Sequence, residues 1–138
     1  MPEIFDSVLD TDSPLFWPIV SLNEAYRRGD LSPVEVLEEA VVRAEAFNPS
    51  LNAYLERLDE QARQQAKVAE KLFMNSKKDI PLLCGVPLSI KDTFELAGSV
   101  TTYGSEFFQE NLTQFDSGLV RRLRETGAVF TGKTNTPE

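Results

Sequence analysis

The chain has 138 residues, of which 41% are hydrophobic and 26% are charged, and its formal net charge is −8. These values are typical of one globular domain with a core of useful size and argue against intrinsic disorder. The acidic excess argues against direct contact with nucleic acid or an anionic membrane, because both surfaces need clustered lysine and arginine.

Histidine is absent and Cys84 is the single cysteine, which limits the chemistry open to the chain. Ser-His-Asp and Cys-His catalysis are excluded within it, and so are a histidine-ligated metal, an intrachain disulfide and a thiolate metal cluster. Proton transfer near neutral pH would fall to a lysine, a carboxylate or a tyrosine with a shifted pKa. Cys84 follows Leu82 and Leu83, so we expect it to be a buried apolar residue. No metal or organic cofactor is implied.

The beginning of the chain carries Glu3, Asp6 and Asp10 in place of the basic start and apolar run of a signal peptide. No stretch approaches the roughly 20 apolar residues that span a membrane. We therefore expect a soluble protein in the cytoplasm, without membrane association.

Residues 1–20 combine prolines with aromatic residues and predict an irregular arm that packs its aromatic side chains onto the body. Ser21 and Glu24 have the spacing of a capping box. They predict a short helix that ends at Gly29.

A second helix is predicted to begin after Ser32, with Pro33 at its first position, and to end at Asn48-Pro49. Its apolar stripe consists of Val34, Leu37, Val41 and Ala44. Residues 51–58 then read as a short strand or extended segment.

A third helix is predicted to begin at Asp59 and to end in a polar turn over residues 75–79. Its narrow stripe would allow close packing and consists of Ala62, Ala66, Ala69 and Phe73. The three helices occupy residues 21–80 in this interpretation, and we expect them to wrap a sheet.

From residue 81 onward the pattern changes to strand, loop, helix and strand. Residues 82–90 predict an apolar strand, and a loop rich in glycine, serine and threonine follows over residues 92–105. Asp116 or Ser117 caps the predicted helix, and Gly127 closes it. Its inward residues are Leu119, Val120 and Leu123.

Residues 128–133 predict a second buried strand, which completes a βαβ unit. Two nearly continuous apolar strands favour a parallel pair covered on both faces. We therefore predict an α/β fold: a mixed, mostly parallel sheet with helices on both faces, in which residues 81–138 begin the core of a single domain.

Lys91 is unusual because it ends an apolar strand, where a turn residue is common. Alternation along the strand sends Leu88 and Ile90 to one face and Ser89 and Lys91 to the other. Lys91 would lie at the carboxyl edge of the sheet, where open α/β sheets place ligand sites. Burial lowers the pKa of a lysine and makes the neutral amine a base. The alternative is that Lys91 and Asp92 form a solvated charged turn.

Three sequence blocks follow one another with compatible spacing: GVPLSIKD, TTYGS and RRLRETGAVFTGKTNTPE. Together they resemble the amidase signature family of amide hydrolases. The earlier segment DLSPVEVLEEAVVRAEAFNPSLNAYL resembles the N-terminal helices of that family. The resemblance covers residues 20–138, leaves the arm unplaced, and implies that residues 1–138 are the N-terminal portion of one amidase domain.

The resemblance implies a Ser-cisSer-Lys mechanism with Lys91 as its base. A neutral lysine takes a proton from a bridging serine, which deprotonates the nucleophilic serine, and the acyl-enzyme is released to water or ammonia. This scheme needs a desolvated lysine and no histidine. No run in the chain resembles the Gly/Ser-rich signature that carries both serines. We expect the serines to lie beyond Glu138 and this chain to be inactive alone.

The resemblance also implies further substrate-binding or site-shaping residues, namely Thr101, Thr102, Gly104, Ser105 and Asn135. For the threonines and the Gly-Ser pair, loop structure alone is an alternative. Lys133 could support the surroundings of the site or be a solvated strand end. The letters from Gly127 to Thr134 fit a Walker phosphate loop, but the apolar strand that they contain is the wrong context for nucleotide binding.

Three functions stay open at this point. The first is a hydrolase acting on a small-molecule amide. The second is a non-catalytic truncated product or interaction module. The third is the amidase subunit of a tRNA-dependent amidotransferase, in which a partner protein supplies the tRNA-binding surface. A sheet cut after two strands exposes apolar edges, so we also expect self-association.

Overall fold

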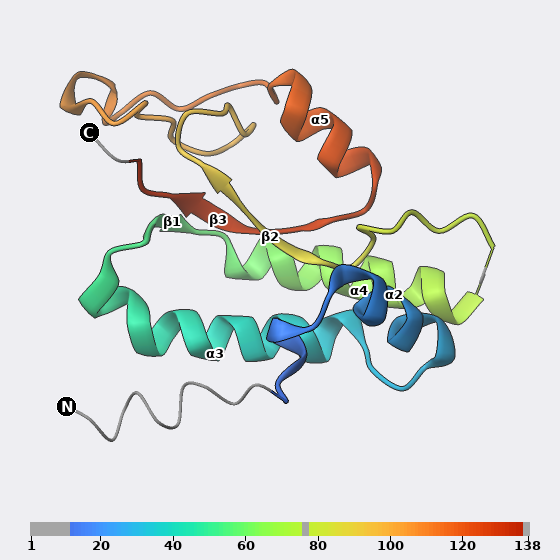
Figure 1. Ribbon diagram of the computed structural model, residues 1–138. Helices are drawn as coiled ribbons and strands as arrows, with labels where there is room; N and C mark the ends of the chain where they lie inside the picture. Colours follow the sequence, from blue (N-terminus) through green and yellow to red (C-terminus); the bar gives the residue numbers. More distant parts are fainter. Residues whose placement is uncertain (1–11, 76–77, 137–138) are drawn as a thin grey trace.

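The computed structural model describes residues 12–75 and 78–136 and has three layers (Figure 1). A small sheet lies between two long helices on one side and a short helix with long loops on the other. The long helices are α3 (Pro33–Leu51) and α4 (Asp59–Asn75), and the short helix is α5 (Gly118–Glu125). Within the described ranges, no helix has the length and apolar character needed to cross a bilayer.

The described chain begins with a 3₁₀ turn, η1 (Pro14–Phe16), followed by helix α2 (Ile19–Arg28). The predicted capping box at Ser21 is wrong, because the helix already begins at Ile19 after Pro18, whose φ of −56° is fixed by its ring. Gly29 ends the helix as predicted, with a φ of 76°.

The predicted aromatic arm is tested only in part, because residues 1–11 lie outside the described residues. Phe16 and Trp17 are exposed. The guanidinium of Arg43 lies 5.0 Å from the centre of the Phe16 ring. The arm contacts α3 through this cation–π contact and through a hydrogen bond from the Ser13 hydroxyl to Glu39. Leu15 packs against the core, whereas the side chains of Phe16 and Trp17 are exposed.

Helix α3 begins with the predicted capping box. The Ser32 hydroxyl accepts a hydrogen bond from the Val34 amide, and the Glu35 carboxylate accepts one from the Ser32 amide. The predicted end at Asn48-Pro49 is wrong: the helix continues to Leu51. A proline in the last turn removes only one backbone donor, and Asn52 closes the helix in the left-handed conformation.

The two long helices pack closely through small side chains. The predicted stripe of α4, Ala62, Ala66, Ala69 and Phe73, is buried as expected. On α3 the buried residues are Pro33, Val36, Leu37 and Val41. Two residues of the predicted stripe, Leu37 and Val41, are therefore buried, whereas Val34 and Ala44 are half-buried. Leu37 and Val41 join Ala62, Ala66 and Val129 in one cluster. Helix α4 therefore packs against both α3 and β3.

The sheet consists of β1 (Tyr54–Arg57), β2 (Pro87–Lys91) and β3 (Val129–Thr134), in the order β1-β3-β2. Strand β2 runs parallel to β3, as predicted from the βαβ pattern, and β1 runs antiparallel to it. The fold is therefore a mixed α/β fold. Strand β2 begins later than predicted, because residues 82–85 form turns and Gly85 has a φ of 76°.

A bulge interrupts β3 beside Gly132. Leu88 pairs with Phe130, but the next residue of β2, Ser89, pairs with Gly132, so Thr131 is the extra residue. Gly132 has a φ of 153°, and a Cβ atom there would lie 2.2 Å from the carbonyl oxygen of Glu56. Only glycine permits this close approach of β1 to β3.

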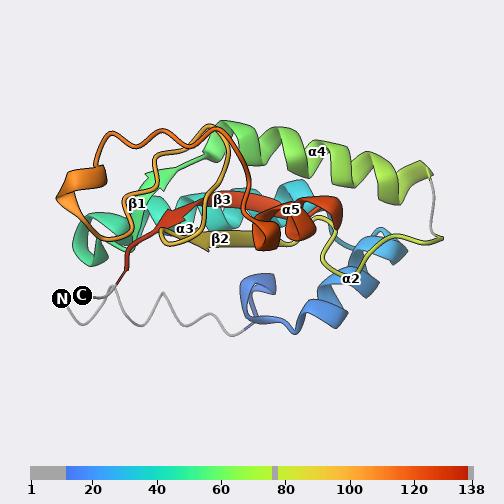
Figure 2. The ribbon, with the colours of Figure 1, turned by 90° about the horizontal axis from the view of Figure 1, so that it is seen from above.

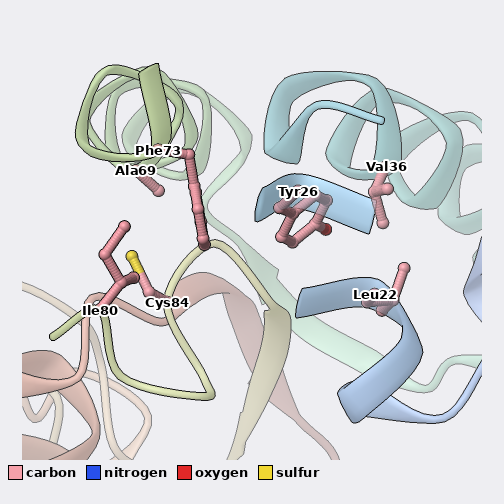
Figure 3. Packing of buried hydrophobic residues seen from close by; sticks show 7 residues of the cluster. All are labelled: Leu22, Tyr26, Val36, Ala69, Phe73, Ile80 and Cys84. Atoms are coloured by element: carbon pink, nitrogen blue, oxygen red, sulfur yellow. The ribbon is translucent and has the colours of Figure 1, made fainter. Parts of the chain in front are cut away.

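A second cluster fills the space between α2, α3, α4 and the segment that leads to β2 (Figure 3). Its residues are Leu22, Tyr26, Val36, Ala69, Phe73, Ile80 and Cys84. The rings of Tyr26 and Phe73 are 5.4 Å apart. Cys84 is buried, as predicted, and burial raises the pKa of its thiol. This cysteine is a packing residue.

Candidate functional site

Lys91 is the last residue of β2 and pairs with Thr134 of β3. It lies at the carboxyl edge of the parallel pair, as predicted. Its side chain is exposed, and within the described residues its amine makes no hydrogen bond or ion pair. The described chain therefore does not itself supply the desolvated surroundings that would make Lys91 a neutral base. The reason is that β2 is an edge strand of the described sheet, with β3 as its one neighbour.

Asp92 directly follows Lys91 but has the opposite environment, with its side chain 1% exposed. Its carboxylate accepts hydrogen bonds from the Thr102 amide, at 3.1 Å, and from the Thr102 hydroxyl. Its amide donates to the Thr134 carbonyl at 3.0 Å, and its carbonyl accepts from the Tyr103 amide at 3.1 Å. The alternative of a solvated Lys91-Asp92 turn is therefore wrong for the aspartate.

Lys133 of β3 is the cation that faces Asp92. Its Nζ atom lies 3.1 Å from Asp92 Oδ1, and its side chain is 0% exposed. The ammonium also donates to the Thr101 hydroxyl at 2.7 Å and to the Val100 carbonyl at 3.4 Å. The alternative of a solvated strand end is wrong for Lys133. A buried charge of this kind is stable only when it is paired and hydrogen-bonded.

The bulge in β3 explains why Lys133 is buried on this side. Val129 packs against α3 and α4, whereas Phe130 and Ile90 pack on the α5 side. Strict alternation would place Lys133 on the face of Val129. The extra residue at the bulge reverses the alternation, and Lys133 pairs with Ile90 and turns toward the loop that carries Thr101.

Further hydrogen bonds close the loop over residues 92–117. The Thr113 hydroxyl donates to the carbonyls of Leu96 and Ser99, at 2.8 Å each. The Asp116 carboxylate accepts from the Ala97 amide at 2.8 Å and pairs with Arg124 at 2.6 Å. The Arg124 guanidinium lowers the pKa of the Asp116 carboxyl. Ser117, not Asp116, caps α5, through a hydrogen bond from the Val120 amide.

The loop also carries a phenol–carboxylate pair at its surface. The Tyr103 hydroxyl donates to Glu95 at 2.8 Å. This hydrogen bond lowers the pKa of the Glu95 carboxyl and raises the pKa of the Tyr103 phenol. Seen from above, the loop and α5 lie over β3 (Figure 2).

The predicted site-shaping residues fall into two groups. Thr101 and Thr102 meet at the Asp92–Lys133 pair, so the structure brings them together at the buried carboxylate next to Lys91 in sequence, not at the exposed Lys91 amine. Gly104 and Ser105 are exposed; Gly104 has a φ of 78° and lies against Thr136, and Ser105 caps the 3₁₀ turn η2 (Glu106–Phe108). Their substrate-binding roles stay predictions.

Asn135 follows β3 and connects its end to the segment before β1. Its side-chain amide donates to the Asn52 carbonyl at 3.2 Å, and its backbone amide donates to the Ala53 carbonyl at 2.8 Å. The residue fixes the strand end, and a role in substrate binding stays a prediction. The Walker pattern has the wrong context, as expected, because Gly132, Lys133 and Thr134 are residues of a strand.

Asp92 was missed as a member of the site. The signal that could have found it is the adjacency of opposite charges at a strand end: alternation must send one of the two side chains inward. The partner of the inward carboxylate could not be chosen from the sequence, because the bulge that turns Lys133 has no unique sequence pattern.

Comparisons with known proteins place this geometry in a family. The amidase family model matches residues 35–138. The chain is 37% identical to a glutamyl-tRNA(Gln) amidotransferase subunit of Syntrophobacter fumaroxidans, covering 85% of this chain and 24% of that protein. It is 42% identical to the putative amidase AmiB2 of Mycobacterium bovis, covering 80% of this chain and 23% of that protein.

Solved structures agree with the sequence comparisons. The fold matches 6-aminohexanoate cyclic dimer hydrolase with a TM-score of 0.76 and 32% identity, covering 91% of this chain and 24% of that one. The chain thus spans about a quarter of the length of the relatives that it matches. Because the family model covers most of the chain and the fold agrees, the chain belongs to the amidase signature family.

Proposed function

We propose that residues 1–138 are the N-terminal portion of an amidase domain that cleaves carbon–nitrogen amide bonds by a Ser-cisSer-Lys mechanism. Lys91 is its base. The observation that carries this proposal is the unpartnered amine of Lys91 at the carboxyl edge of β2, within the block that resembles the family's catalytic lysine. Amide cleavage by this route needs a lysine that is free to accept a proton.

In the proposed reaction, this chain supplies the base, and the other reacting groups come from the part of the amidase domain that it does not span. Neutral Lys91 accepts a proton from the bridging serine, the bridging serine deprotonates the nucleophile, and the nucleophile attacks the amide carbon. The amine leaves with a proton returned along the same path, and water or ammonia releases the acyl group. Both serines belong to the part that these 138 residues do not span, and so does the cover that desolvates Lys91.

A second function within the family is favoured by one specific observation. The similarity to a glutamyl-tRNA(Gln) amidotransferase subunit supports an amidase that works beside a partner protein. In that case ammonia from the amide substrate is passed on, and the partner supplies any tRNA contact. For the chain on its own, the alternative is a non-catalytic interaction module. The cytoplasmic location of the protein stays a prediction.

The test uses a protein extended to the full length of its relatives, with Lys91→Ala as the variant. We expect the rate on simple aliphatic and aromatic amides to fall by several orders of magnitude, as when one member of a catalytic unit is removed. Lys71→Ala on the exposed side of α4 is the matched control and should keep full activity. Activity that survives Lys91→Ala excludes Lys91 as the base. Copurification of a second protein would favour the amidotransferase.

A further inference from the structure

Two opposite charges stand next to each other at the point where the proposed base lies. A carboxylate within about 4–6 Å favours the charged form of a lysine and so works against a lysine that must become neutral. Lys91 and Asp92 are adjacent in sequence, which keeps their backbones within reach of such a pairing. The chain therefore needs a way to keep the Asp92 carboxylate from the Lys91 amine.

The strand geometry separates the two side chains. Lys91 is exposed on one side of β2, whereas the Asp92 carboxylate is buried on the side that faces the loop. Each carboxylate oxygen has a partner there: Oδ1 lies 3.1 Å from the ammonium of Lys133, and Oδ2 accepts from the amide and hydroxyl of Thr102. The negative charge of Asp92 is thus fully compensated away from Lys91.

We propose that Lys133 is a positioning residue of the active site, which holds the Asp92 carboxylate on the inner side of the sheet and thereby leaves the Lys91 amine unpaired. This inference rests on the proposed function of Lys91. Lys133 acts through Asp92 and does not need to touch the substrate.

The energetic cost of a buried unpaired charge favours a fixed pairing of Asp92 with Lys133. A buried ion pair is stable only as a pair, and removing one partner leaves an uncompensated charge in an apolar place. Without Lys133, the Asp92 side chain can regain an ionic partner by turning outward to Lys91. The Thr101 hydroxyl, 2.7 Å from the Lys133 ammonium, fixes the inner position of the cation.

Three other titratable groups surround the pair and have partners of their own. Glu95 accepts from the Tyr103 phenol at 2.8 Å. Glu56 of β1 accepts from the Val100 amide at 3.2 Å. Since these acidic groups are already engaged, they do not displace Asp92 from the Lys133 ammonium.

The experiment measures how fast the amine of Lys91 is acetylated by an activated acetate ester at neutral pH in this chain, with peptide mass spectrometry as the readout. The exposed Lys67 on α4 serves as the internal reference. Lys133→Met should slow acetylation of Lys91 about tenfold, because an opposite charge favours the unreactive ammonium. Asp92→Asn should leave the rate unchanged or increase it. Lys71→Met is the matched control and should change nothing.

The different expected responses of the two variants separate this role from a purely structural one. If Lys133 and Asp92 only stabilised the strand ends, both variants would disturb Lys91 in the same direction, and that result would overturn the inference. The double variant Asp92→Asn with Lys133→Met should return Lys91 to within about threefold of its original rate. An unchanged rate in Lys133→Met alone would also overturn it.

A measurement on the unsubstituted chain covers the case that Lys133→Met fails to fold. In NMR spectra with ¹⁵N-labelled lysine, the ammonium of Lys133 should exchange slowly with water and show contacts to Thr101, while that of Lys91 exchanges fast. A slowly exchanging Lys91 ammonium in contact with Asp92 would contradict the inference. Neither the acetylation rate nor the NMR measurement needs catalytic turnover. A failure of this inference is therefore distinguishable from a failure of Lys91 as the base, which is tested by loss of activity.

Discussion

The helical layer and the strand-end region of this molecule are both buried, but different forces hold them. Between α3, α4 and β3 the buried cluster is apolar and consists of Leu37, Val41, Ala62, Ala66 and Val129. At the carboxyl ends of β2 and β3 the buried polar side chains include those of Asp92, Lys133, Thr101 and Thr113.

This difference predicts how each region responds to substitution. Apolar packing depends on volume, so its cost grows gradually with the misfit. A buried charge pair depends on the presence of both partners, so the loss of one is costly at once. The strand-end region should therefore be the more sensitive of the two, although it contains less apolar surface.

The largest effect on stability is expected from Lys133→Met. It removes the cation that stabilises Asp92 in its buried position, and we expect the free energy of unfolding to fall by about 3–5 kcal/mol. Urea denaturation followed by circular dichroism measures this change. Lys91→Met is the matched control: the side chain is exposed and unpartnered within the described residues, so its effect should stay within about 0.5 kcal/mol. Equal losses in the two variants would contradict the contrast between the two lysines.

An intermediate effect is expected from Ala66→Leu in the helical layer. Ala66 is 0% exposed between α3 and α4, and the larger side chain must push the helices apart. Overpacking of this kind costs about 1–3 kcal/mol. Val68→Leu on the exposed face of the same helix controls for helix propensity and should be nearly neutral. If Ala66→Leu were neutral as well, the layer would be packed more loosely than its contacts indicate.

The same contrast explains which parts of the fold could be predicted from the sequence. The apolar residues of the α4 stripe and the two residues of the Ser32 capping box stand at spacings that helix geometry imposes. These spacings were sufficient to predict both features. The parallel pairing of β2 and β3 followed from the order of strand, loop, helix and strand. Helix ends were less predictable: α2 begins after Pro18, and α3 continues through Pro49, because proline permits more than one outcome near a helix terminus.

The site was predictable only where it lies on a regular strand. The place of Lys91 follows from alternation along β2, but its exposure does not, because exposure depends on what packs against an edge strand. The burial of Lys133 depends on one extra residue in β3, and a shift of one residue exchanges the two faces of a strand. Sequence periodicity has no means of detecting that shift.

The smallest effect, and the one that separates the two regions by pH, is expected from Asp116→Asn. Asp116 pairs with Arg124 at the end of the loop, its side chain is 15% exposed, and the pair lowers the pKa of its carboxyl. A lowered pKa in the folded state means that stabilisation is present above the unfolded pKa and is lost as pH falls through the folded value. We expect Asp116→Asn to lower the free energy of unfolding by about 1 kcal/mol at pH 7, because one hydrogen-bonded ion pair at the surface is lost. The difference from the unsubstituted chain should shrink below about pH 4.

Glu38→Gln in the helical layer is the matched comparison, since Glu38 also pairs with an arginine, Arg63, but is 44% exposed. Its effect should be smaller at every pH, because water screens the more exposed pair. Urea denaturation midpoints from about pH 3 to pH 7 test both variants, and a larger loss for Glu38→Gln would show that exposure does not govern these pairs.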